Sequence, residues 1–184
     1  RWVSKIFVAY GGNWLVRSSV NSQEEHVLEV DENGSWTNLE EAIEFLDEHM
    51  TEPAIIRLGR DIELTQTIVI DLPYSLTIQG LSYGVVSIKA GTGLTGSPMF
   101  RCLSECYFKM LSFDATTLSD YGTLPDEDCI RLLGSDTYNE VKDCSFDGFY
   151  NTILDSTNAE LWVFETDIIN SYGSGILIHG AEAG

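Results

Sequence analysis

The 184-residue sequence predicts an all-β solenoid, in which short strands wind through coils that stack on one another. Two observations predict this fold. Isoleucines recur every 23 residues, at Ile130, Ile153 and Ile176. The apolar runs within 53–184 are short, rich in β-branched and aromatic residues, and separated by Gly and Asn, as strands are. A fixed period of this size indicates a repeat that buries its apolar face only against its neighbours, so we expect the three isoleucines to form one interior ladder.

The repeat is clearest near the C-terminus and becomes irregular upstream. Shifted by 23, residues 138–151 fall on 161–174 with similar chemistry: Val141 on Phe164, Phe146 on Ile169, Asp147 on Asn170, Gly148 on Ser171 and Phe149 on Tyr172. Phe113 matches Phe146 at a spacing of 33, and Leu76 matches Phe108 at a spacing of 32. The surplus residues fit loops at 116–125 and 90–98, both rich in turn-forming residues. We therefore predict about four coils, two of which carry loops.

The first fifty residues have a different pattern. Residues 38–50 are predicted to form a helix, because Leu39, Ile43 and Leu46 fall on one face. Thr37 with Glu40 fits a capping box. Residues 31–52 would thus be a turn and a capping helix over the open end of coils at 53–184, which we expect to continue beyond the given residues. Residues 1–30 contain two strand-like runs, which fit a hairpin, an arm on a neighbouring chain or part of a larger domain.

Two motifs resemble the pectin-lyase-like superfamily. GSWTNLEEAI at 34–43 is similar to the stretch that caps the first coil in that superfamily, and VKDCSFDG at 141–148 is similar to a coil signature. The resemblance covers about residues 31–184 and concerns fold, because pectate lyases, pectin methylesterases, polygalacturonases and phage tailspikes share it. It implies a right-handed parallel β-helix with one N-terminal capping α-helix, three sheets and a polar ladder at one corner. The candidates for that ladder are Asp114, Asp147 and Asn170.

Charge and composition exclude several partners. The net charge is −19, which argues against binding to nucleic acid or to anionic membranes, since both need clustered Lys and Arg. It also disfavours uronic-acid polymers unless Ca²⁺ intervenes. No apolar run is long enough for a transmembrane helix, so we expect no membrane insertion. The four cysteines form no C-x-x-C pair, so we expect small core residues rather than a zinc site and leave a disulfide open.

Acidic residues supply the candidates for catalysis and for metal binding. Glu165 and Asp167 are two apart, so they are expected to point the same way on a strand, and Asp147 is like a catalytic acid by its place in the coil. Enzyme signatures of the superfamily are absent, so we interpret Asp147 as structural. Asp126, Glu127 and Asp128 offer oxygen ligands for Ca²⁺, with a soluble acidic loop as the alternative. No other cofactor is expected.

Aromatic residues are the better indication of function. Tyr121, Tyr138, Tyr150 and Trp162 fall at or near predicted corners and loops, where rings are platforms for sugars. Two function classes remain open. One is a structural virion or surface protein, such as a phage tailspike, fibre or adhesin, that presents loops to a host glycan. The other is a polysaccharide-active lyase, hydrolase or esterase. We favour the first, for which the resemblance implies a homotrimer or larger virion assembly and a virion or extracellular location.

Overall fold

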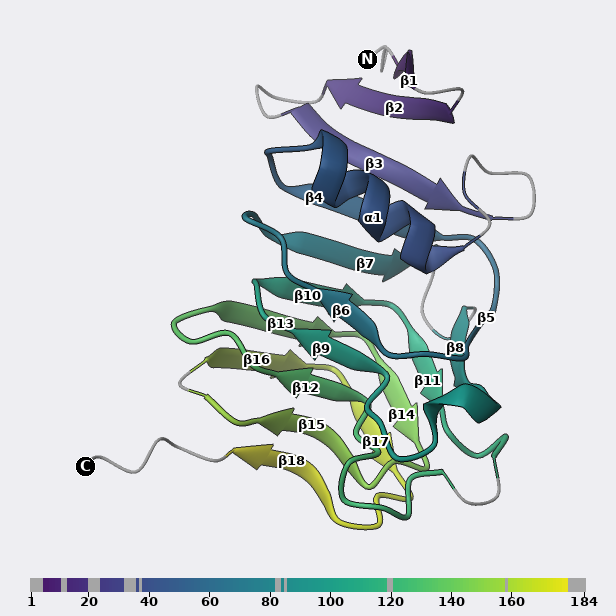
Figure 1. Cartoon of the computed structure of the whole chain (residues 1–184), viewed down its shortest axis with the longest axis vertical. Coiled ribbons are helices and arrows are strands. Elements are labelled where there is room, and N and C mark those ends of the chain that lie inside the picture. Colours follow the sequence, from purple (N-terminus) through teal and green to yellow (C-terminus); the bar gives the residue numbers. More distant parts are fainter. Residues whose placement is uncertain are drawn as a thin grey trace.

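The structure is a computed structural model that describes residues 5–10, 13–19, 24–31, 36, 38–81, 84, 86–118, 121–157 and 159–178, with side chains from residue 26 onward. Within these ranges the chain forms a parallel β-helix of five coils (Figure 1). The predicted all-β solenoid with one helix near the N-terminus is therefore confirmed. The estimate of four coils was one too low, because 54–70 forms a coil without echoing the later ones in sequence.

Each coil contributes one strand to each of three sheets. Sheet A contains β1 (Lys5–Tyr10), β2 (Asn13–Ser19), β3 (Glu24–Val30), β4 (Ala54–Leu58), β7 (Leu76–Gly80), β10 (Cys106–Lys109), β13 (Tyr138–Lys142) and β16 (Glu160–Phe164). Sheet B contains β5 (Ile62–Leu64), β8 (Ser87–Ala90), β11 (Ser112–Asp114), β14 (Ser145–Asp147) and β17 (Asp167–Ile169). Sheet C contains β6 (Ile68–Ile70), β9 (Phe100–Cys102), β12 (Ile130–Leu132), β15 (Asn151–Asp155) and β18 (Ser174–Ile178). From β3 onward all of the pairings in these sheets are parallel.

The 23-residue register holds in only one of the three sheets. In sheet C, Ile153 stands opposite both Ile130 and Ile176. In sheets A and B the last two coils are 22 residues apart, so Val141 faces Val163 rather than Phe164. The expected matches of Phe146 with Ile169 and of Asp147 with Asn170 were likewise one residue too far along. The extra residue lies in the corner after β17, where Asn170 adopts a left-handed φ of 52°. Upstream, Ile78 faces Phe108 at a spacing of 30 rather than 32.

Alternating side chains fill the interior between the three sheets. The burial pattern of β10 and β13 alternates strictly, as expected of strands with one face in the core. Rings stack from coil to coil, with Phe113 and Phe146 parallel at 4.7 Å between centroids. All four cysteines are free and buried, in agreement with the expectation that they fill the core. Ile130 and Ile153 are 1% and 0% exposed, but Ile176 in the last described coil is 40% exposed.

Helix α1 (Leu39–His49) lies at the end of the stack where sheets B and C begin (Figure 1). Its apolar face is buried in the core, as the period predicted. Asn38 is the N-cap, since its side chain accepts a hydrogen bond from the Glu40 N–H at 2.8 Å. The predicted capping residue, Thr37, lies outside the described residues. Tyr74 donates its hydroxyl to the carbonyl of Leu46 at 2.7 Å, which ties the helix to the second coil.

The N-terminal strands extend sheet A beyond the coils. β1 and β2 form an antiparallel pair, β2 pairs antiparallel with β3, and β3 pairs in parallel with β4. Of the three possibilities for residues 1–30, a hairpin that continues the sheet is the arrangement observed. After β3 the chain forms α1, which contacts β3 and lies beside β6 at the end of sheet C.

We predict that the isoleucines of the ladder contribute unequally to the free energy of unfolding along the stack of coils. Ile153→Ala should lower the free energy of unfolding by about 2–5 kcal/mol, because it leaves a cavity between two coils. Ile176→Ala, the matched control in the same ladder, should cost about half of that or less, because its side chain is already partly hydrated. Urea unfolding followed by circular dichroism measures both. Equal losses would contradict this prediction.

We predict an alkaline loss of stability that depends on Tyr74. Burial, with a smaller contribution from Asp47, raises the pKa of Tyr74 from 10.0 to about 12. The unfolded chain then ionises this tyrosine before the folded one does, so its contribution is complete below pH 10 and is lost as the pH rises through 12. Between pH 10 and pH 12, the urea midpoint should fall less for Tyr74→Phe than for the wild type. Tyr172→Phe, at a ring that is 64% exposed, is the control and should behave like the wild type.

Candidate functional site

Four aromatic side chains form a stripe on the outer face of sheet A. Tyr107 lies on β10, Tyr138 on β13, and Trp162 and Phe164 on β16. They point outward because the intervening residues of these strands, such as Phe108 and Val141, fill the core. We call these four residues the aromatic stripe.

Neighbouring rings of the stripe are in contact distance of one another. The ring centroids of Tyr107 and Tyr138 are 5.8 Å apart, and those of Tyr138 and Trp162 are 6.3 Å apart. Trp162 and Phe164 follow at 5.7 Å. Trp162 and Phe164, both on β16, are 45% and 39% exposed, whereas Tyr107 and Tyr138 are partly buried. The stripe therefore crosses three consecutive coils, and its most exposed rings lie in the last described coil.

Charged side chains lie between and beside the rings. Tyr107 donates its hydroxyl to Glu105 at 3.2 Å, and the Trp162 indole N–H donates to Glu160 at 2.6 Å. Lys109 forms an ion pair with Glu140 at 2.9 Å, and its ammonium lies 5.5 Å from the centre of the Tyr107 ring. These contacts orient the rings of Tyr107 and Trp162.

The two tyrosines of the stripe stay neutral at physiological pH. Partial burial, followed by the charge of Glu105, raises the pKa of Tyr107. Loss of water contact, followed by the charges of Glu140 and Glu160, raises the pKa of Tyr138. Each ring therefore combines an apolar face with a neutral hydroxyl that can form hydrogen bonds.

Only half of the predicted glycan-binding aromatics lie in the stripe. Tyr138 and Trp162 do, but Tyr121 is buried and donates its hydroxyl to the Ser97 carbonyl at 2.8 Å. Tyr150 is half-buried at the corner before β15, with its ring close against the backbone of Gly173. The prediction for Tyr121 was wrong, because the loop that carries it folds back onto the loop at 90–98.

Sequence reasoning missed the other two rings of the stripe. Tyr107 precedes the inward Phe108, and strict alternation along β10 would have placed it outside. Phe164 had been matched to the inward Val141, and the register of 22 in sheet A turns it outward, opposite Lys142.

The predicted calcium ligands are occupied by protein groups. Glu127 is fully buried and accepts the backbone N–H groups of Gly96, Thr123 and Leu124 at 2.9–3.0 Å. Asp128, also fully buried, accepts hydrogen bonds from Arg131 and from Asn151 at 2.8 and 2.9 Å. These two acids therefore anchor the loops at 90–98 and 116–128 to each other and to the coils. Among the described residues no group of three or more His, Cys, Asp and Glu side chains could hold a metal ion.

A buried polar ladder runs along the corner that leads into sheet C. The side-chain amide of Asn151 donates a hydrogen bond to Asp128, and the oxygen of the same side chain accepts one from the backbone N–H of Ser174 at 3.1 Å. Asp128, Asn151 and Ser174 are thus spaced 23 residues apart. The predicted ladder of Asp114, Asp147 and Asn170 lies at the exposed corner after sheet B instead.

The three residues of this predicted ladder are not all paired with one another in sheet B. Asp114 stands opposite Asp147, whereas the residue opposite Asp147 in the last coil is Ile169. Asn170 still reaches back to donate to Asp147 at 2.8 Å, and Asp114 accepts the N–H and hydroxyl of Thr116 at 2.8 and 2.6 Å.

The catalytic candidates are not brought together on one strand. Glu165 occupies the corner between β16 and β17 with a left-handed φ of 46°, and Asp167 begins β17. Their predicted common orientation on one strand was therefore wrong. Asp147 is the last residue of β14, and its carboxylate accepts a hydrogen bond from the side-chain amide of Asn170.

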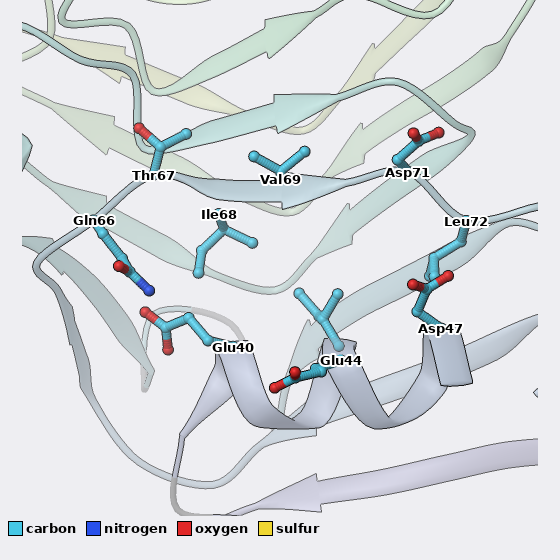
Figure 2. Close-up of a pocket in the computed structure, with 10 residues that line it drawn as sticks. Glu40, Glu44, Asp47, Gln66, Thr67, Ile68, Val69, Asp71 and Leu72 are labelled. Carbon is cyan, nitrogen blue, oxygen red and sulfur yellow. The ribbon is translucent and has the colours of Figure 1, made fainter. Parts of the chain in front are cut away.

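Pockets between described residues include the following two. One, of about 440 Å³, lies between α1 and β6. Figure 2 shows Glu40, Glu44 and Asp47 on its helix side and Asp71 beyond the end of β6. Its lining contains no basic side chain, which disfavours an anionic ligand. The other, of about 300 Å³, lies under the loop at 116–121, beside Tyr172. None of the described helices is long and apolar enough to cross a membrane.

No protein-family model, curated protein or solved structure matches this chain. The parallel β-solenoid is compatible with the pectin-lyase-like resemblance, but it does not establish membership of that superfamily.

We predict that the acidic triplet is structural. Asp128→Ala should lower the free energy of unfolding by about 3–5 kcal/mol, because it leaves Arg131 and Asn151 without a buried partner. Asp126 also contacts Arg131, at 3.1 Å, but it is 69% exposed. Asp126→Ala is therefore the control, with an expected cost of about 1 kcal/mol or less. A calcium chelator should leave the thermal midpoint of the wild type unchanged, and a chelator-dependent midpoint would contradict the prediction.

Proposed function

We propose that this chain is the β-helical shaft of a virion or cell-surface structural protein, such as a phage tailspike, fibre or adhesin, and that its aromatic stripe binds a host glycan. The observation that carries the glycan-binding proposal is the line of four contacting rings across three coils. Sugars present apolar C–H faces rimmed by hydroxyl groups, and the stripe offers ring faces beside carboxylate acceptors. Binding would therefore take place on the outer face of sheet A rather than on the loops that the sequence suggested.

The composition of the stripe favours a glycan over a protein partner. The cores of protein–protein interfaces are depleted of charged residues, especially Lys and Glu. Here Lys109, Glu140 and Glu160 lie among the rings and contact them or one another. A ligand rich in hydroxyl groups can hydrogen-bond to these charges without stripping them of all their partners.

The virion or extracellular location and the homotrimeric assembly are part of the proposal and rest on the resemblance. A β-helix suits a shaft, because stacked coils hold surface side chains at fixed spacings over a long distance. The catalytic candidates Glu165 and Asp167 lie on successive elements rather than opposite each other, so we assign them no catalytic role. Sedimentation velocity measures the oligomeric state independently of glycan binding.

We predict that Trp162→Ala weakens glycan binding by about tenfold or more. An aromatic side chain that a bound ligand covers typically contributes more than about 1 kcal/mol to the free energy of binding. Affinity electrophoresis of the full chain through gels that contain a panel of bacterial and plant polysaccharides measures the retardation. Tyr172→Ala removes a more exposed ring, 64% against 45% for Trp162, outside the stripe and is the matched control.

The two variants separate binding from assembly. Retardation lost in Trp162→Ala and kept in Tyr172→Ala supports the proposal. If Trp162→Ala leaves retardation intact but dissociates an oligomer, the stripe is a subunit interface and the glycan proposal is wrong.

A further inference from the structure

We infer that the ligand of the aromatic stripe is an uncharged glycan chain that lies along the coil axis, across β10, β13 and β16, rather than along one strand. This inference rests on the proposed function of the stripe and specifies the charge and the direction of its ligand.

The direction follows from the register of sheet A. Tyr107 stands opposite Glu140, which stands opposite Trp162, so these three residues form one column that crosses the strands. Tyr138 stands opposite Glu160 in the neighbouring column, and its ring bridges the gap between Tyr107 and Trp162. A ligand aligned with β10 or β13 would meet one ring, and a ligand aligned with β16 would meet only Trp162 and Phe164. A ligand that crosses the strands meets a ring on each of three strands spaced about 4.8 Å apart.

The charge class follows from the acids along this path. Glu140 lies between Tyr107 and Trp162 in their shared column, Glu105 accepts the Tyr107 hydroxyl, and Glu160 accepts the Trp162 indole N–H. Carboxylates accept hydrogen bonds from sugar hydroxyl groups but repel carboxylate or sulfate groups. A uronic-acid or sulfated chain would place its charges beside these three acids.

The basic side chains on the outer face of sheet A do not offset the negative charge of these acids. Lys109 is engaged by Glu140 at 2.9 Å. Lys142 stands opposite Lys109 on one side and Phe164 on the other, at the edge of the stripe. Beyond these contacts the chain has a net charge of −19, whose field opposes the approach of any polyanion.

The test uses two sets of probes with the full chain. Affinity gels contain either neutral polysaccharides (dextran, galactomannan and mixed-linkage β-glucan) or polyanions (polygalacturonate and heparin). Neutral manno- and cello-oligosaccharides of increasing length then compete for binding. We expect retardation by a neutral polymer that changes little between ~0.05 and ~0.5 M salt, since no ion pair forms with the ligand. Affinity for the oligosaccharides should rise up to about three sugar units and then level off, matching three strands.

A charge variant sharpens the test. Glu140→Gln removes the central carboxylate and releases Lys109, so polygalacturonate should begin to retard this variant at low salt but not the wild type. Neutral binding should weaken by about threefold, because the amide oxygen still accepts a hydrogen bond but is a weaker acceptor than the carboxylate. Tyr172→Ala again is the control and should match the wild type throughout.

The outcomes distinguish this inference from the proposed function. Salt-sensitive binding of a polyanion that Trp162→Ala abolishes would leave the stripe a glycan site and overturn the inferred charge. Binding that is weakened by Phe164→Ala but not by Tyr107→Ala would overturn the inferred direction, because Phe164 shares β16 with Trp162 whereas Tyr107 lies two coils away. If no probe retards the wild type more than Trp162→Ala, both the proposed function and the inference fail.

Discussion

Mutual burial between stacked coils is the interaction on which the rest of this structure depends. Ile153 is fully buried because a coil lies on each side of it, whereas Ile176 at the same position of the last described coil is substantially exposed. No coil could hide its apolar face alone, so inward side chains must keep a common register from coil to coil. The outward side chains then fall into columns as a consequence. In the aromatic stripe Tyr107 and Trp162 share one column, while Tyr138 and Phe164 stand in the two columns beside it, so the order of the rings is inherited from the core beneath them.

This dependence explains which parts of the fold were predictable from sequence. Inward isoleucines at 130, 153 and 176 mark sheet C directly, and the period of α1 marks its buried face. A repeat length counts the residues between two equivalent positions, but it does not say where along the coil an extra residue lies. Here the extra residue sits at the corner near Asn170, so sheets A and B keep a spacing of 22. That single residue was enough to assign Phe164 to the wrong face.

The candidate site was half predictable for a similar reason. Tyr138 and Trp162 lie outside by local alternation along their strands, which a sequence shows. Tyr121 is buried by contacts between two loops far apart in sequence, held by the carboxylate of Glu127. No local pattern reports that contact. The ladder of Asp128, Asn151 and Ser174 does have the 23-residue spacing, but its members share only the ability to hydrogen-bond, so similarity of residue type does not reveal it.

The chemistry of that ladder follows from the cost of burying charge. Stacked carboxylates about one strand spacing apart would repel one another, and more strongly in the interior than in water. Only the first member, Asp128, is an acid, and it lies where Arg131 can pair with it. Asn151 continues the ladder with an amide that both donates and accepts, and Ser174 ends it with its backbone N–H. The Asp128–Arg131 ion pair thus anchors a ladder whose other members are neutral, and the neighbouring carboxylate of Glu127 joins the two loops at this corner.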